Sequence, residues 1–164
     1  MPLIYCIKWI AAKTTDMLNE TLKSLFKRDL TKLKVEIESY RKESNIWIIE
    51  EGIANSAGNL CLHLIGNTNG FIGTQIGKTG YIRQRDLEFS LKDVPRAQLI
   101  KRIEETMLMV DSVLDTITAE QFETLYPIEV FGHPMSTEFF LVHLAGHLTY
   151  HLGQINYHRR LLDK

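Results

Sequence analysis

The histidines are the residues of this sequence whose type and spacing could do chemistry. All but one of the six lie at or after position 133, and four share one helical pattern near the end of the chain: His143, His147, His151 and His158. At about 100° per residue, His147 and His151 point within roughly 40° of each other. Leu148 and Ile155 belong to an apolar stripe beside this face, so the pair is expected to turn toward the interior.

A pair of histidines at positions i and i+4 can chelate a metal ion. Their rings stand about one helical turn apart, so two ring nitrogens can converge on one ion, with bonds of roughly 2.0–2.1 Å to zinc. The same spacing also occurs where histidines lie on a helix surface or are hydrogen-bonded in a core. His63 favours the metal site, because it lies with Leu60 and Leu64 on a second inward-facing helix. The sequence therefore offers three ligands: His63, His147 and His151.

Three protein ligands are typical of a catalytic metal site, in which water or substrate takes the remaining positions. A structural zinc site would need a fourth ligand, often a thiolate. Cys61 is a poor choice for it, because this residue points about 200° away from His63 around the helix. Asn67, one turn after His63, could hydrogen-bond a ligand or a bound water, or be an ordinary polar residue.

Other catalytic motifs are missing from the sequence. There is no His-Glu-x-x-His, no P-loop, no Gly-x-Gly-x-x-Gly after a strand and no Gly-x-Ser-x-Gly. The Glu-x-x-His pairs of di-iron bundles do not occur either. A general base would have to come from neighbouring turns or loops, where Tyr150, Glu129 and His133 are weak candidates.

Four amphipathic helices are predicted to carry these residues. In each, apolar residues recur at helical spacing with polar or charged residues between them. Pro95 suits the first turn of the third helix, and Ser136 can cap the last one. The expected ranges are about 14–41, 55–76, 95–116 and 136–162.

Two longer connections separate the helices. The stretch GKTGYIRQRDLEFSLKDV has two glycines and many charges but no sustained period, which predicts a crossover loop between the second and third helices. Thr118 and Gln121 form a capping-box pattern that predicts a short helical turn before the irregular YPIEVFGHPM. No linker divides the chain. The sequence thus predicts an all-α four-helix bundle with a long crossover, in a single domain over residues 1–164.

The composition narrows the function classes. With 19 Lys and Arg against 20 Asp and Glu, the formal charge is -1, so no surplus positive field attracts nucleic acid or anionic lipid. Two cysteines, Cys6 and Cys61, do not make the disulfide framework of a small secreted protein. The apolar start lacks the basic segment of a signal peptide, and no run approaches the roughly 18 apolar residues of a membrane span. We expect a cytoplasmic protein that binds neither nucleic acid nor membrane.

Two motifs resemble those of a known family. The string HLAGHLTYHLGQINYHRRLL, with HLTYHLGQI at its centre, resembles the His-x-x-x-His-x-Gly-Gln signature of the DinB-like superfamily. CLHLIGN resembles the histidine-bearing motif of that family's second helix, and both order and spacing agree. GYIRQRDLEF is similar to a segment of the uncharacterised DUF1572 group, so the resemblance covers nearly the whole chain from about Thr14.

The resemblance implies a four-helix bundle with a long crossover, frequent homodimerisation, and a nickel- or zinc-type ion. That ion would be held by one histidine of the second helix and two of the fourth. These positions are His63, His147 and His151 in this sequence. His143 precedes the matched pair and lies outside the signature, although a shifted pairing of His143 with His147 stays open.

Three further residues follow the matched histidines. Gly153 and Gln154 belong to the motif: the glycine would let another backbone approach closely, and the glutamine could order the end of the site. Core packing explains either residue equally well. His158, further along the helix, is expected at the surface or in an interface.

Relatives of this type include metal-dependent S-transferases that use low-molecular-weight thiols, and proteins described as metal-dependent hydrolases. A divalent ion with an open position can deprotonate a coordinated thiol or lower the pKa of bound water to about 7. We therefore expect a metal-dependent transferase or hydrolase that acts on a small molecule. The first alternative is a non-catalytic, metal-binding or stress-related bundle that serves as a binding or dimerisation module. The second is a structural bundle without an ion.

Overall fold

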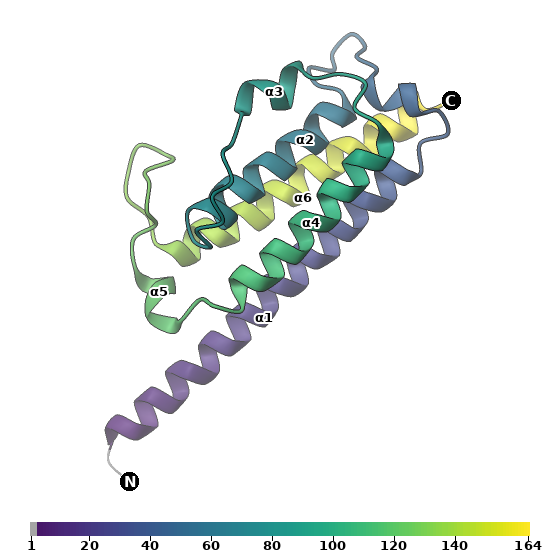
Figure 1. Cartoon of the computed structure of the whole chain (residues 1–164). Coiled ribbons are helices and arrows are strands. Elements are labelled where there is room, and N and C mark those ends of the chain that lie inside the picture. The colour runs from purple at the N-terminus through teal and green to yellow at the C-terminus, as the bar shows by residue number, and fades with distance from the viewer. Residues whose placement is uncertain (1–2) are drawn as a thin grey trace.

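The computed structural model describes the backbone of residues 3–164 and the side chains of residues 17–164. Within this range the regular elements are helical, and the single strand-like pairing is one bridge between Leu125 and Ser136 (Figure 1). None of the helices described here combines the length and apolar character that crossing a bilayer requires.

Four long helices form the bundle, which confirms the all-α prediction. Helix α1 contacts α4 and α6, and α2 contacts the same two helices, so the four make a closed ring. In Figure 1, α1 and α6 run in one direction and α2 and α4 in the other. Their bounds are Leu3–Glu38 for α1, Ala57–Thr68 for α2, Arg96–Leu114 for α4 and Thr137–Leu162 for α6.

Apolar side chains from all four helices fill the space inside the ring. Leu30, Ile103 and Ile155 are fully buried, and they come from three different helices. Leu64 of α2 is buried in the same core, so all four helices contribute side chains to it. Burial of such side chains contributes about 1.5–3 kcal/mol each, so the spacing of the apolar residues is what holds the helices at fixed orientations.

The helix ends differ from the predicted ranges in two places. Helix α1 begins at Leu3, well before the expected position 14, because no glycine or proline interrupts the chain from there to Glu38. The predicted helix 55–76 is divided into α2 and a π-helix, η2 (Asn69–Thr74), where two glycines follow each other closely. The other ends lie within a few residues of their expected positions.

Local hydrogen bonds fix several of the helix starts. The predicted capping box is confirmed: Thr118 accepts from the Gln121 backbone N–H, and α5 (Ala119–Glu123) follows it. Ser136 caps α6, as expected, by accepting from the Phe139 N–H at 3.2 Å. A short 3₁₀ helix, η1 (Glu43–Trp47), lies in the first connection.

The crossover contains a helix that the sequence analysis did not expect. Because α2 and α4 run in the same direction, the chain must return along the bundle between them (Figure 1). On the way it forms α3 (Arg85–Ser90), whose first turn carries acidic residues that suit a helix N-terminus. The Asn59 side chain of α2 donates to the carbonyl oxygens of Glu88 at 3.0 Å and Leu91 at 2.8 Å. These bonds hold the crossover against α2.

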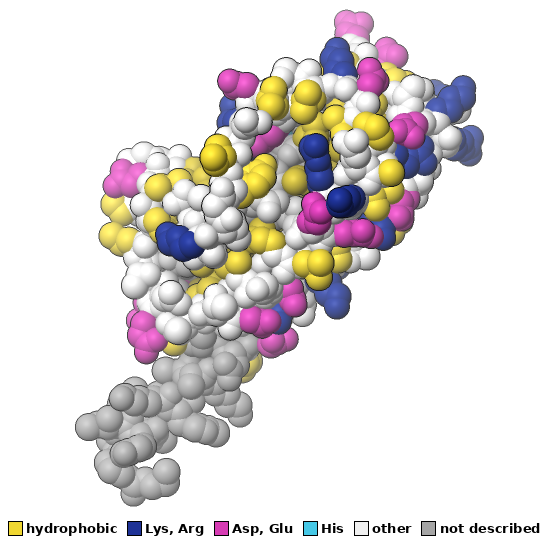
Figure 2. Space-filling view, in the orientation of Figure 1, with side chains coloured by type: hydrophobic (Ala, Val, Ile, Leu, Met, Phe, Trp, Pro, Cys, Tyr) yellow, Lys and Arg dark blue, Asp and Glu magenta, His cyan; other side chains and the backbone are white. Residues whose placement is uncertain are grey.

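Hydrophobic side chains gather over the crossover on the outer face of the molecule (Figure 2). Ile82 is 82% exposed, and Tyr81, Leu87 and Leu91 are also exposed. None of the histidines among the described side chains appears on this face in Figure 2. The crossover lies against α2, the helix that carries His63.

The prediction that His158 lies at the surface or in an interface is wrong. Its ring is buried, and both ring nitrogens are hydrogen-bonded within the chain. Nε2–H donates to the Ile48 carbonyl oxygen at 2.9 Å, and Nδ1 accepts from the Tyr40 hydroxyl at 2.7 Å. The ring thus ties α6 to the end of α1 and to the first connection, which a pattern on one helix could not show.

This buried ring should make stability depend on pH. Burial lowers the pKa of His158 below its ordinary value of 6.5, so the unfolded chain takes up a proton at a higher pH than the folded chain. The stability that the neutral ring contributes is complete above about pH 6.5 and is lost as the pH falls toward the folded-state pKa. In urea unfolding, His158→Gln should flatten the loss of stability that accompanies a fall in pH below about 6.5. The exposed His133→Gln should not, and equal slopes for both variants would contradict this account.

Candidate metal centre

Three histidines from two neighbouring helices meet at one point. His63 lies on α2, and His147 and His151 lie one turn apart on α6. One ring nitrogen from each can be chosen so that all three lie within 4.8 Å of one another. The ring centroid of His63 is 5.2 Å from that of each of the other two, and the centroids of His147 and His151 are 4.6 Å apart. The structure brings together the three residues that the sequence analysis selected.

The His63 ring is oriented by a carboxylate from the crossover. Its Nδ1 lies 2.9 Å from Oε2 of Glu88, on α3. An ionised carboxylate can only accept hydrogen bonds, so Nδ1 carries a proton, and in the neutral ring the lone pair is then on Nε2. Nε2 is the atom that faces His147. A carboxylate behind the ligating ring is the usual arrangement around metal-bound histidines.

Glu88 itself is held tightly. Arg83 donates to both of its carboxylate oxygens, at 2.7 and 2.8 Å. Burial alone would raise the pKa of Glu88, but the bonds from Arg83 and His63 outweigh it and keep the pKa below its ordinary value. Gly66 leaves the necessary space on α2, since a Cβ there would stand 2.1 Å from the carboxylate. The site therefore depends on a glycine, a carboxylate and a guanidinium together.

His151 is oriented by Gln154, the motif residue expected to order the end of the site. The Nδ1–H of His151 donates to Gln154 Oε1 at 2.6 Å, and the Gln154 amide donates to the Tyr150 hydroxyl at 3.3 Å. The amide thus fixes the His151 tautomer that leaves Nε2 unprotonated. In this ring too, the nitrogen left free is the one suited to a ligand.

His147 completes the group without such a partner. Its Nδ1 is buried and has no hydrogen-bond partner among the described residues. Burial, together with the neighbouring His151 and His63, lowers the pKa of His147 to about 4. Burial also lowers the pKa of His151, for the same reason. Both rings are therefore neutral near pH 7, which is the form that binds metals.

The donor set fits a divalent ion. The Nε2 atoms of His63 and His147 are 3.3 Å apart, which is long for a hydrogen bond between ring nitrogens. Two nitrogens bound to one tetrahedral ion at 2.0–2.1 Å would stand about 3.3 Å apart. Neutral imidazoles suit zinc and nickel better than magnesium or calcium, which prefer oxygen ligands.

A cavity of about 250 Å³ adjoins the histidines. His63 and His147 form part of its wall, together with aromatic side chains and two arginines. A small molecule in this cavity would therefore touch two of the three candidate ligands.

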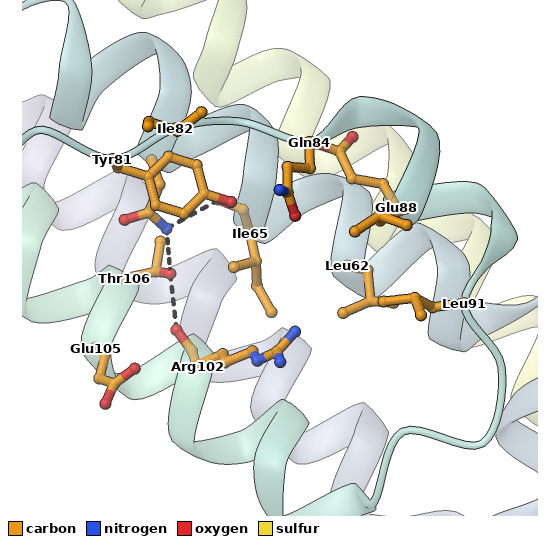
Figure 3. Close-up of a pocket in the computed structure, with 12 residues that line it drawn as sticks. Leu62, Ile65, Tyr81, Ile82, Gln84, Glu88, Leu91, Arg102, Glu105 and Thr106 are labelled. Carbon is orange, nitrogen blue, oxygen red and sulfur yellow. Dashed lines mark hydrogen bonds between the residues drawn. The ribbon is translucent and has the colours of Figure 1, made fainter.

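A second cavity, of about 440 Å³, lies between α2, α4 and the crossover (Figure 3). Its lining includes Glu88 and none of the three clustered histidines. Figure 3 shows Tyr81, Ile82 and Gln84 of the crossover on one side and Arg102 and Glu105 of α4 on the other. The carboxylate that orients His63 is thus also part of this wall.

Other residues considered in the sequence lie outside the cluster. His143 is exposed, with its ring centroid 6.2 Å from that of His147, so the shifted pairing with His147 is not the one that converges. Cys61 is fully buried in the core and is not a member of the histidine cluster. Gly153 faces open space: no atom of the described residues lies within 4 Å of a Cβ added there. Asn67 is buried and lines the 250 Å³ cavity.

The candidate bases differ in their distance from the site. The Tyr150 ring packs on the His151 ring with centroids 5.1 Å apart. Glu129 and His133 are exposed and do not line the cavity beside the histidines, although Val130 and Phe131 do. Glu88 was not identified from the sequence. The signal that could have found it is the pair of charges Arg83 and Glu88 in an otherwise irregular crossover.

Comparison with protein families agrees with the motifs. A family model described as the DinB superfamily matches residues 12–155. The chain belongs to the DinB superfamily. No curated protein matches it. The match does not distinguish between branches of the DinB superfamily, and the three-histidine cluster fits a metal-binding protein of this superfamily.

Removing the carboxylate that orients His63 tests this arrangement in the metal-free protein. In Glu88→Ala, Nδ1–H loses its acceptor while Nε2–H could still donate to His147, so ¹⁵N NMR should show the His63 proton moving from Nδ1 to Nε2. The variant should also lose about 1–3 kcal/mol of unfolding free energy.

Two matched variants separate orientation from folding. Glu88→Gln retains an acceptor and should keep the Nδ1–H form. The exposed Asp86→Ala, on the same short helix, should leave the His63 signals unchanged. An unaltered tautomer in Glu88→Ala would refute the proposed role of the carboxylate.

Proposed function

We propose that this protein binds one divalent ion, nickel or zinc, through His63, His147 and His151, and uses it as a metal-dependent enzyme. The proposed reaction is thiol S-transfer or hydrolysis on a small molecule. One observation carries the proposal: three imidazoles converge beside a cavity, and Glu88 and Gln154 each accept a hydrogen bond from Nδ1 of one of them, so that Nε2 faces the common centre.

Each part of the site has a role in this proposal. When bound, the ion would supply a Lewis acid that lowers the pKa of a coordinated water or thiol. Glu88 and Gln154 keep two rings in the required orientation, so little reorganisation accompanies binding. The aromatic side chains of the cavity exclude water around a bound molecule. Three protein ligands leave at least one position for the substrate or water.

A thiol used in the reaction would come from the small molecule. Cys61 is fully buried, and burial raises the pKa of its thiol to about 12, so it is an inert core residue. The side chain of Cys6 lies outside the described residues. A low-molecular-weight thiol therefore fits the transferase form of the proposal.

Homodimerisation is proposed through an exposed stripe of α6. Five apolar or aromatic side chains, spaced three, eight, seven and four positions apart on one face, are between 53% and 64% exposed: Phe139, Val142, Tyr150, Tyr157 and Leu161. Gly146 and Gly153 lie on the same face, with nothing within 4 Å of a Cβ. A second helix could approach closely here.

The single-domain organisation, the cytoplasmic location and the lack of a nucleic-acid partner stay predictions from the sequence.

Metal analysis tests the ligand set. Tag-free protein loaded with nickel or zinc should hold one ion per chain by mass spectrometry, and a chelator should lower its melting temperature. Alanine at any of the three histidines should weaken binding more than about 100-fold, because losing only a residue that hydrogen-bonds a ligand costs about 10–100-fold. His143→Ala, one turn earlier on α6, should bind normally. Absence of a stoichiometric ion, with melting indifferent to chelator, would overturn the site.

Turnover separates the enzyme from a binding module. The metal-loaded protein should convert at least one member of a panel that pairs thiols with electrophilic or ester substrates, and His147→Ala should abolish that conversion. Turnover indifferent to His147→Ala would contradict the enzyme proposal. A fully loaded protein inactive with all substrates would favour the non-catalytic module.

The dimer can be tested by light scattering. The wild-type protein should have twice the mass of one chain, and Tyr157→Glu, which places a charge in the α6 stripe, should reduce it to one chain. Leu108 on α4 is 73% exposed, so Leu108→Glu serves as the matched control and should remain dimeric. A monomeric wild type would contradict the proposal.

A further inference from the structure

The cavity beside the candidate ligands has one sign of charge. Arg83 and Arg85 line it, and its lining includes no aspartate or glutamate. Its other polar side chains are Asn67 and three histidines. When charges of one sign line a concave site, they raise the local concentration of ions of the opposite sign. The polar part of the wall therefore suits an anion.

The two arginines differ in their partners. Arg83 is only 18% exposed, and its charge is offset by the Glu88 carboxylate, to which it donates two hydrogen bonds. Arg85 is exposed, with no carboxylate within salt-bridge distance among the described residues. Its guanidinium lies 5.4 Å from the centre of the Phe89 ring, and that ring packs on His63 with centroids 5.0 Å apart. A cation without a carboxylate partner thus lies one aromatic ring away from the candidate metal site.

The rest of the cavity is apolar and largely aromatic. Phe131 packs on Phe140 at 5.8 Å and on His143 at 4.7 Å between centroids, and Phe71 packs on Phe140 at 5.2 Å. Arg83 lies over the Phe71 ring at 5.3 Å. Sites of this kind bind small molecules through apolar contact and use a few polar groups for orientation. A ligand here needs a flat or apolar body as well as its charge.

We propose that this cavity binds a small anion, a carboxylate or phosphate on an aromatic or other apolar body, with Arg85 as the charged partner of its anionic group. The proposal rests on the function proposed above and specifies the substrate class of that site. The anionic group meets Arg85 at the cavity mouth, and the apolar body lies against Phe71, Phe131 and Phe140. A ligand bound in this way also contacts His63 and His147, which line the same cavity.

The experiment is a set of NMR titrations of the full chain, first freed of metal with EDTA and then loaded with zinc. The probes are benzoate, phenyl phosphate and benzamide, which resembles benzoate in shape but carries no charge. Benzoate or phenyl phosphate should bind several-fold more tightly than benzamide in both forms, and shifts should centre on the cavity residues. The ratio between the two anions distinguishes carboxylate from phosphate.

Two charge-neutral variants give the decisive comparison. Arg85→Gln should weaken binding of the preferred anion about three- to tenfold, as expected for one ion pair near water, and should leave benzamide binding unchanged. Arg160→Gln is matched to it, because Arg160 is also exposed and lies over an aromatic ring, Tyr157, at 5.5 Å, away from the cavity. It should bind the anion within about twofold of the wild type.

The outcomes separate this inference from the metal site. Equal binding of benzoate, phenyl phosphate and benzamide, or equal effects of the two arginine variants, would overturn the anion cavity even if zinc is bound normally. An anion preference that depends on Arg85 in the metal-free protein would support it even if zinc fails to bind, and then only the proposed metal site would be overturned.

Discussion

The hydrogen bond between His63 on α2 and Glu88 on α3 is the contact on which the rest of the site depends. It places a buried carboxylate behind the ring and fixes the tautomer that leaves Nε2 facing α6. The carboxylate stays ionised because Arg83 donates hydrogen bonds to it, and it fits against α2 because Gly66 has no side chain. Removing one partner of such a buried set leaves a charge or a donor uncompensated, which costs more than the bond itself contributes. The crossover is therefore part of the site as well as a connection between helices.

The bundle explains why the ligands come from α2 and α6. These helices are neighbours in the ring, and the i, i+4 pair on α6 presents two rings on the side that faces α2. Asn59 bonds the crossover to α2 one turn before His63, so the segment that supplies Glu88 cannot move independently of the helix that supplies the ring. Rigid helices and a pinned crossover hold three imidazoles together in a way that loops would not.

Much of this could be predicted from the sequence, and the failures have physical causes. Helical spacing of apolar residues found the four long helices, and the converging faces found His63, His147 and His151, because a helix fixes the direction of each side chain. The same reasoning missed α3, which is too short to show a period. It also missed Glu88, whose partner is distant in sequence, and it placed His158 at the surface because its partners Tyr40 and Ile48 belong to other segments. The periodicity of one segment does not show which residues of another segment it will contact.

X-ray absorption spectroscopy of the zinc-loaded protein tests the central claim most directly, because it counts and identifies the atoms around the ion. The account predicts three imidazole nitrogens at about 2.0–2.1 Å, with a remaining light-atom ligand and no sulfur. A spectrum with one or two imidazoles, or with a sulfur ligand, would contradict it.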